Sequence, residues 1–103
     1  MKGGMKMYLN CFDEVKKITK ELVKVPSIVK TSGETDCAKR IFEFYKGLPY
    51  FHENQDCLKL IQTIDDEIER HIVITHIKGT KGNSNKALIL MGHLDTVGVD
   101  DFE

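Results

Sequence analysis

Apolar side chains recur at helical spacing in the first half of the chain. Every three or four residues one occurs, at Phe12, Val15, Ile18, Leu22 and Val25. This period places them on one face of a helix. Asn10, with Asp13 three residues on, suits the N-cap of such a helix. Pro26 ends it, because proline lacks a backbone donor and restricts the residue before it. The pattern predicts a helix over residues 10–25.

A second helix is predicted over residues 34–46. Its apolar stripe consists of Ala38, Ile41, Phe42 and Tyr45. Ser32 or Thr35 would cap the start of this helix. Gly47 would terminate it, and Pro49 prevents its continuation. We interpret the stripes of both helices as packing faces rather than as grooves for a cofactor or a partner.

Two strands are predicted next. Residues 57–63 partly alternate between apolar and polar side chains, and residues 72–77 are rich in β-branched side chains. The acidic stretch 65–69 between them is interpreted as a solvated turn or a short helical bend, because the glycine and ligand spacing of a calcium-binding EF-hand is absent. Residues 79–86 form a polar loop whose two glycines match no nucleotide-binding pattern. The two strands therefore form a hairpin-like unit.

The strongest apolar run is Ala87 to Met91, five residues without a polar side chain. Such a run predicts a strand buried on both faces, as in the middle of a largely parallel sheet sandwiched by helices. The predicted fold class is therefore α/β. In sheets of this kind, reactive groups gather at the carboxyl ends of the strands. Here the run leads directly to His93 and Asp95.

His93 and Asp95 form the candidate site. Residues i and i+2 of an extended segment point to the same side, so both side chains would face one cavity while Leu94 turns into the core. A neutral imidazole is a good zinc ligand, and a metal-bound histidine usually donates its second ring N–H to a carboxylate or carbonyl. The short motif has a second interpretation, in which a loop histidine lies beside an aspartate that caps the following turn.

The residues around this pair extend the pattern. Residues 88–97 read Leu-Ile-Leu-Met-Gly-His-Leu-Asp-Thr-Val, residues 21–27 end in a Pro-Ser pair, and residues 32–34 read Ser-Gly-Glu. These blocks resemble the opening and the first metal motif of the zinc-dependent aminoacylase, acetylornithine deacetylase and carboxypeptidase family of metallopeptidases. The continuation 92–102 is most similar to the arginine-utilisation (RocB-type) branch of that family, because most other members have proline where Gly98 stands.

The resemblance implies a metal-dependent amidohydrolase or peptidase with a zinc-exopeptidase-like, three-layer α/β/α fold and a mixed sheet. Residues 1–103 would be the N-terminal portion of one catalytic domain. His93 would be the first metal ligand at a site of two zinc ions, and Asp95 would be the catalytic carboxylate that orients and polarises it. The implied substrate is a small peptide or an N-acyl amino acid, with a link to arginine utilisation. The full-length protein would be a homodimer.

The family's other functional residues would all follow this motif, beyond Glu103. They are a bridging aspartate, a glutamate pair, another acidic ligand and a final histidine. A catalytic zinc needs about three protein ligands, so we expect the chain alone to be inactive. Its 103 residues make one small domain. A parallel sheet that stops after its first central strand leaves an apolar edge, and we expect this edge to favour association.

Composition argues against several other classes of function. The chain is 41% hydrophobic and 30% charged, with a formal net charge of −1. Its mild basic excess within residues 1–50 is interpreted as a solvated helix face, so no nucleic-acid partner is expected. No apolar run approaches the roughly 18 residues that cross a bilayer, so no membrane partner is expected. The three cysteines form no close pair, which suits a reducing cytoplasm. Cys11 and Cys37 are interpreted as small packing residues, and the third cysteine is Cys57.

The remaining histidines are interpreted as structural or surface residues. His52 lies in an aromatic stretch. His71 and His76 are five positions apart, and this odd separation sends them to opposite faces of a strand. A competing hypothesis treats the whole chain as a non-catalytic α/β interaction or structural module. In that case His93 and Asp95 merely finish a strand and cap a turn.

Overall fold

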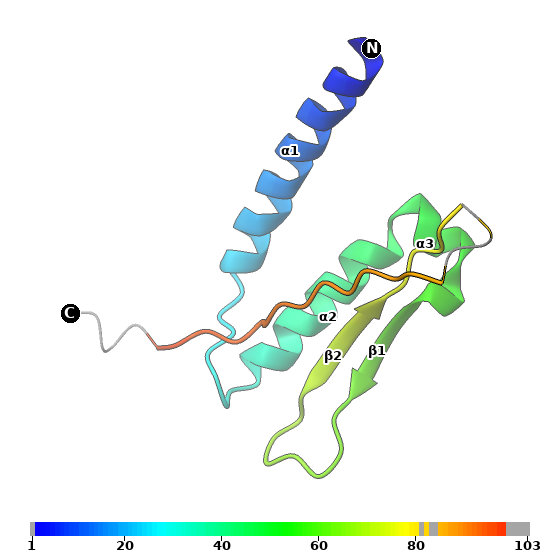
Figure 1. Ribbon diagram of the computed structural model, residues 1–103. Coiled ribbons are helices and arrows are strands. Elements are labelled where there is room, and N and C mark those ends of the chain that lie inside the picture. The colour runs from blue at the N-terminus through cyan, green and yellow to red at the C-terminus, as the bar shows by residue number, and fades with distance from the viewer. Residues whose placement is uncertain (1, 81, 83–84, 99–103) are drawn as a thin grey trace.

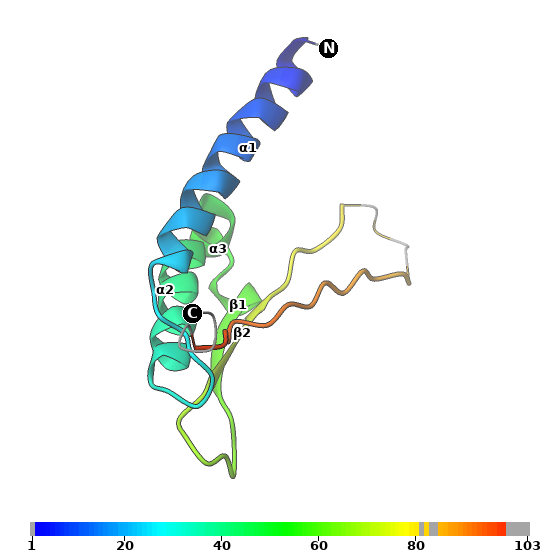
Figure 2. The same cartoon turned by 90° about the vertical axis from the view of Figure 1, so that its left-hand side faces the viewer.

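The computed structural model describes residues 2–80, 82 and 85–98, and only the course of the backbone for residues 2–10. Its elements are α1 (Lys2–Val23), α2 (Gly33–Lys46), α3 (Pro49–Glu53), the 3-10 turn η1 (Gln55–Cys57), β1 (Leu58–Gln62) and β2 (His71–Thr75). α2 packs along the β1–β2 hairpin, and α1 projects away from this body (Figure 1). The extended segment after residue 85 returns past β2 toward the loop that follows α1 (Figure 2). The chain therefore combines helices with a two-stranded antiparallel sheet.

α1 is longer than the sequence pattern predicts. It begins at Lys2, so Asn10 lies inside the helix and the prediction that it forms the N-cap is wrong. Residues 2–9 include lysine and methionine, which favour helices, and no proline that would stop one. The helix ends at Val23, before Pro26, close to the predicted end.

The outer half of α1 lies open to solvent. Phe12 and Val15 are 67% and 61% exposed. The prediction that the whole apolar stripe is a packing face is therefore wrong for this half, whereas Ile18 and Leu22 are half-buried nearer the body. Like the other helices in the described part of the chain, α1 lacks the combination of length and apolarity that a membrane span requires.

α2 confirms the second predicted helix, but neither predicted cap residue caps it. Ser32 occupies the N-cap position without a side-chain hydrogen bond. The Thr35 hydroxyl instead donates to the Glu69 carbonyl at 2.7 Å, so it joins α2 to the hairpin connection. Gly47 ends the helix, as predicted, in a right-handed conformation with φ −77°. The buried hydrophobic residues of α2 are Cys37 and Ala38.

The hydrophobic core lies where α2, α3 and the hairpin meet. Its buried members are Phe51, Cys57 and Leu58. Tyr45 of α2 packs edge-to-face on Phe51, with ring centroids 5.4 Å apart. The sequence analysis treats Pro49 only as a break, yet this residue opens α3. Proline suits the first turn of a helix, because the N–H that it lacks has no partner there.

β1 and β2 confirm the predicted hairpin. They pair antiparallel, with Leu60 opposite Val73. Beyond the ladder, the Thr63 N–H donates to the Arg70 carbonyl at 2.9 Å and closes the connection. The acidic stretch 65–69 lies in this connection as a turn, as the sequence predicts.

The segment 87–91 is not the buried strand that the sequence predicts. Its large side chains, at residues 88–91, are between 80% and 94% exposed. A strand forms only where a neighbour pairs with its backbone N–H and C=O groups, and the part of the chain that the structure describes offers none to this segment. The described sheet is therefore antiparallel rather than mixed. Residues 81, 83 and 84 of the predicted loop, and the continuation 99–102, lie outside the described residues.

The loop between α1 and α2 packs tightly against the start of α2. A Cβ on Gly33 would lie 1.7 Å from the Pro26 carbonyl oxygen, so only glycine fits this contact. Lys30 adopts a left-handed φ of 65°, and its backbone N–H donates to a carboxylate oxygen of Glu34 at 2.7 Å. The same loop carries Ser27, which is 4% exposed.

Replacing Gly33 by alanine tests this contact. The added Cβ would overlap the Pro26 carbonyl, so we expect the free energy of unfolding to fall by about 1–3 kcal/mol or more. Gly47→Ala is the matched control, because its new Cβ would lie 3.6 Å from its nearest neighbour, the Phe44 carbonyl oxygen. Urea unfolding followed by circular dichroism measures both variants. Equal stability of Gly33→Ala and the unchanged chain would contradict the close contact.

The exposed apolar segment 87–91 leads us to expect association in solution. Exposed apolar side chains on an unpaired, extended backbone promote pairing between molecules. Size-exclusion chromatography should show larger species as the protein concentration rises, and Ile89→Lys should weaken this shift. Ile64→Lys is the control, since it removes an isoleucine that is 87% exposed in the hairpin connection. A chain that stays monomeric at every concentration would refute the expectation.

Candidate functional site

His93 and Asp95 come together near the end of the extended segment. Nδ1 of His93 lies 3.2 Å from Oδ1 of Asp95 and 3.0 Å from the Asp95 backbone carbonyl oxygen. Both oxygens are acceptors, so in the neutral ring Nδ1 carries the proton and Nε2 keeps its lone pair. This is the tautomer in which histidine binds a metal through Nε2. The geometry agrees with the expectation that both side chains lie on the same side.

The pair lies at a cleft of about 430 Å³ between α2, β2 and the extended segment. Residues of all three elements line it, among them Ile41, Tyr45, Val73 and Leu90. The side chain of His93 is 85% exposed and that of Asp95 is 40% exposed. The imidazole is therefore accessible to a ligand that enters from solvent, and the cleft has the size of a small-molecule site.

The described residues provide part of a metal site rather than a whole one. Within residues 2–80, 82 and 85–98, no group of three or more His, Cys, Asp or Glu side chains is arranged to hold a metal ion. A catalytic zinc takes about three protein ligands. His93 offers one nitrogen of the right kind, with Asp95 placed to orient it. Any further ligands would have to come from outside the described residues.

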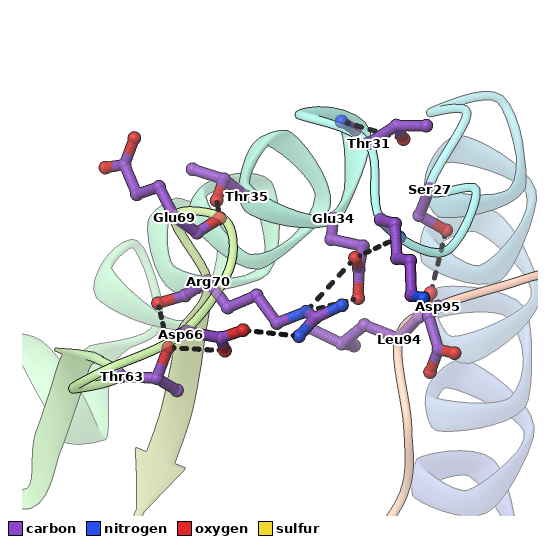
Figure 3. Close-up of polar contacts among 12 residues, drawn as sticks. Ser27, Thr31, Glu34, Thr35, Thr63, Asp66, Glu69, Arg70, Leu94 and Asp95 are labelled. Carbon is purple, nitrogen blue, oxygen red and sulfur yellow. Dashed lines mark hydrogen bonds and ion pairs between the residues drawn. The ribbon is translucent and has the colours of Figure 1, made fainter.

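Three hydrogen bonds hold the site segment to the loop after α1. The Ser27 hydroxyl donates to the Leu94 carbonyl at 2.7 Å (Figure 3). The Thr96 N–H donates to the Ser27 carbonyl, and the Val29 N–H donates to the Thr96 carbonyl, both at 2.8 Å. The two backbone bonds make a parallel bridge between Ile28 and Thr96. Sequence reasoning notes the Pro-Ser pair only as part of a resemblance and misses this contact.

A second polar cluster includes two residues of the cleft lining, Glu34 and Arg70 (Figure 3). Nε of Arg70 lies 3.3 Å from Glu34, and Nη1 lies 2.6 Å from Asp66. The Thr63 hydroxyl donates to the other oxygen of Asp66 at 2.9 Å. Two carboxylates therefore neutralise the guanidinium, which argues against an anion site at Arg70. The sequence analysis misses this cluster, although the spacing of four residues between Asp66 and Arg70 was a signal for a local ion pair.

This cluster shifts two pKa values. The hydrogen bond from Thr63 is the largest effect on the pKa of Asp66 and lowers it, while the charge of Arg70 lowers it further against an opposing effect of desolvation. For Arg70, desolvation is the largest single effect and lowers the pKa, but the hydrogen bonds and charges of Glu34 and Asp66 together raise it above its ordinary value. Both groups are therefore charged at neutral pH.

Of the other histidines, His71 of β2 belongs to the lining of the same cleft. The side chain of His71 is 10% exposed, and its Nδ1 lies 3.4 Å from the Thr35 hydroxyl. Its Nε2 lies 3.7 Å from a Glu69 carboxylate oxygen. His52 and His76 are exposed.

The cysteines are free thiols in different surroundings. Burial raises the pKa of the Cys37 thiol, and a hydrogen bond with Ser27 opposes this shift. Cys37 and Cys57 are buried, so the interpretation of Cys37 as a packing residue agrees with the structure. Cys11 is exposed on α1, and for this residue the same interpretation is wrong.

The chain is similar in sequence to protein RocB of Bacillus subtilis (strain 168), with 35% identity over 95 residues. The alignment covers 92% of the chain and 17% of RocB, so the chain spans about a sixth of the length of this relative. No protein-family model matches the chain, and no solved structure matches it significantly. The similarity agrees with the branch-level resemblance, whereas the wider metallopeptidase family is not established by it.

The Asp66 cluster predicts how stability changes in acid. Because the pKa of Asp66 is lowered in the folded chain, its contribution to stability is complete above about pH 4 and is lost as the pH falls through the folded pKa. Thr63→Ala removes the largest cause of this shift. We expect the Asp66 pKa, followed by NMR, to rise toward its ordinary value, and the loss of stability in acid to become shallower.

Asp65→Asn is the control for this experiment. It removes a neighbouring carboxylate, and asparagine tolerates the left-handed φ of 55° at this position. This variant should not raise the Asp66 pKa. If Asp66 titrates at the same pH in Thr63→Ala as in the unchanged chain, the assigned role of the Thr63 hydrogen bond is wrong.

Proposed function

We propose that this chain supplies the first zinc ligand and its orienting carboxylate to a metal-dependent amidohydrolase or peptidase. The observation that carries the proposal is the contact between His93 and Asp95, which leaves Nε2 with its lone pair on a side chain that is 85% exposed at the cleft. The similarity to RocB supports it, because the residues around this pair resemble the metal motif of the RocB-type branch.

The chemistry of the site follows from the two side chains. A bound zinc ion supplies hydroxide at neutral pH and polarises the scissile carbonyl. Within this chain, Nε2 of His93 is the donor atom. The backbone carbonyl of Asp95 accepts the hydrogen bond from Nδ1, and its carboxylate lies 3.2 Å from the same nitrogen. Together these oxygens would keep the ring in the metal-binding tautomer and make it a more basic ligand. The adjoining cleft has room for a small substrate group.

The finer assignments rest on the resemblance to the RocB-type branch. We propose two zinc ions in the complete site, a small peptide or N-acyl amino acid as substrate, a link to arginine utilisation, and a cytoplasmic location. Residues 1–103 would form the N-terminal portion of a three-layer α/β/α domain in a homodimeric protein. In that fold the segment 87–91 would be a central strand, which would account for its apolar side chains.

The alternative is a non-catalytic α/β interaction or structural module. One observation favours it: Nδ1 of His93 also lies 3.0 Å from the Asp95 backbone carbonyl oxygen. This contact joins two residues that are two positions apart in the chain, so it needs no metal. Metal content therefore separates the two functions.

The experiment uses this chain by itself and a chimera in which it replaces the matching region of RocB. In the chimera we expect zinc by elemental analysis and hydrolysis of N-acyl amino acids or small peptides. His93→Ala should lower the affinity for zinc and the rate of hydrolysis by about tenfold or more. Asp95→Asn should lower them by about 10–100-fold, as the loss of a carboxylate behind a histidine ligand usually does.

His76→Ala is the matched control, because His76 is exposed and does not belong to the cleft lining. It should leave zinc content and hydrolysis unchanged. The chimera could bind no zinc, or His93→Ala could leave its zinc binding unchanged. Either result would show that His93 and Asp95 are ordinary loop residues.

A further inference from the structure

The peptide groups on both sides of Asp95 are anchored to one residue, Ser27. The Ser27 hydroxyl donates to the Leu94 carbonyl at 2.7 Å, and the Ser27 carbonyl accepts from the Thr96 N–H at 2.8 Å. The Leu94 carbonyl belongs to the peptide group before Asp95, and the Thr96 N–H belongs to the one after it. Because each peptide group is planar, these two bonds together orient the backbone of Asp95.

Peptide planarity connects this anchor to the His93 ring. In a trans peptide the C=O and N–H groups point in opposite directions. When the Thr96 N–H points at Ser27, the Asp95 carbonyl points the other way, and its oxygen lies 3.0 Å from Nδ1 of His93. The Asp95 carboxylate approaches the same nitrogen at 3.2 Å. Both acceptors of the Nδ1 proton therefore depend on backbone that Ser27 orients.

Ser27 is itself fixed by the structure around it. The residue is 4% exposed, and its hydroxyl proton is used in the bond to the Leu94 carbonyl. The preceding carbonyl, that of Pro26, lies against Gly33, where no Cβ fits. The anchor thus belongs to the start of α2, and the site segment is attached to it.

We infer that Ser27 is a positioning residue for the His93 ring. Through the peptide groups of Asp95, it holds the ring in the tautomer with Nδ1 protonated and Nε2 open to a ligand. The inference rests on the proposed function for the role of Nε2 as a metal donor, whereas the tautomer itself requires no metal. Ser27 acts through Asp95, and the hydrogen bonds that define its role do not involve the ring.

The experiment reads the ring nitrogens of His93 by ¹⁵N NMR in the 103-residue chain. The spectra are recorded at alkaline pH, so that the two neutral tautomers are compared. The Nδ1–H form should dominate in the unchanged chain. Ser27→Ala should shift the ring toward the Nε2–H form, which free histidine prefers. The Thr96 amide should exchange roughly fivefold faster, because one of the two bonds to Ser27 is lost.

Thr31→Ala is the matched control. Thr31 lies in the same loop, and its hydroxyl bonds to the Ile28 carbonyl at 2.6 Å and to the Gly33 N–H at 3.3 Å, within the loop itself. This variant should leave the His93 tautomer unchanged, whereas Ser27→Thr, which keeps a hydroxyl, should retain the Nδ1–H form. A purely structural effect of loosening the loop would move the tautomer in Thr31→Ala as well, and that result would overturn the inference.

Thr96→Pro provides a second test that leaves the buried Ser27 in place. Proline lacks the N–H that donates to the Ser27 carbonyl, residue 96 is exposed, and proline favours an extended residue before it. We expect the same tautomer shift as in Ser27→Ala. If Ser27→Ala fails to fold, Thr96→Pro provides the answer. A His93 ring that keeps the Nδ1–H form in either folded variant overturns the inference.

The tautomer is measured without metal, so its outcome is separate from that of the proposed function. A chimera that binds no zinc overturns the proposed function, while a tautomer shift in Ser27→Ala still supports the positioning role. An unchanged tautomer overturns the positioning role, while zinc bound through His93 in the chimera still supports the proposed function.

Discussion

The close approach of the Pro26 carbonyl to Gly33 is the contact on which the arrangement of the chain depends. It turns the backbone after α1 and sets Ser27 against the start of α2. From there a hydroxyl and a carbonyl reach the segment that carries the candidate site. The hydrophobic core lies around the other end of α2, near Phe51. One helix therefore has the core at one end and the attachment of the site at the other.

The elements that the sequence predicts well are those defined by local pattern. α2 and the hairpin follow from apolar periods and from turn residues a few positions away. Two predictions are wrong, each because residues outside the pattern that was used decide the structure. The cap signal at Asn10 is overridden because the residues before it also favour a helix. The segment 87–91 has the composition of a buried strand, but burial and pairing depend on neighbours that its own residues do not specify, and the described residues provide none.

The same distinction applies to the candidate site. The contact of His93 with Asp95 joins residues two positions apart, so strand geometry was sufficient to predict it. The bond from Ser27 to Leu94 spans 67 positions. The ion pair of Glu34 with Arg70 joins the first turn of α2 to the connection within the hairpin. No periodicity in the sequence indicates such distant pairs. Ser27 reaches the segment of Leu94 only because the chain turns at Gly33.

The two walls of the cleft are held in different ways. α2 and β2 are hydrogen-bonded elements, whereas residues 87–92 take part in no hydrogen bond among the described residues. The opposite wall is therefore attached at Leu94. At about 3.3 Å per residue, Leu90 lies about 13 Å from this attachment and His93 about 3 Å. If the segment rotated by about 10° about Leu94, Leu90 would move by about 2 Å and His93 by about 0.6 Å. A displacement of this wall about Leu94 would therefore change the width of the cleft at Leu90 more than it moves the imidazole.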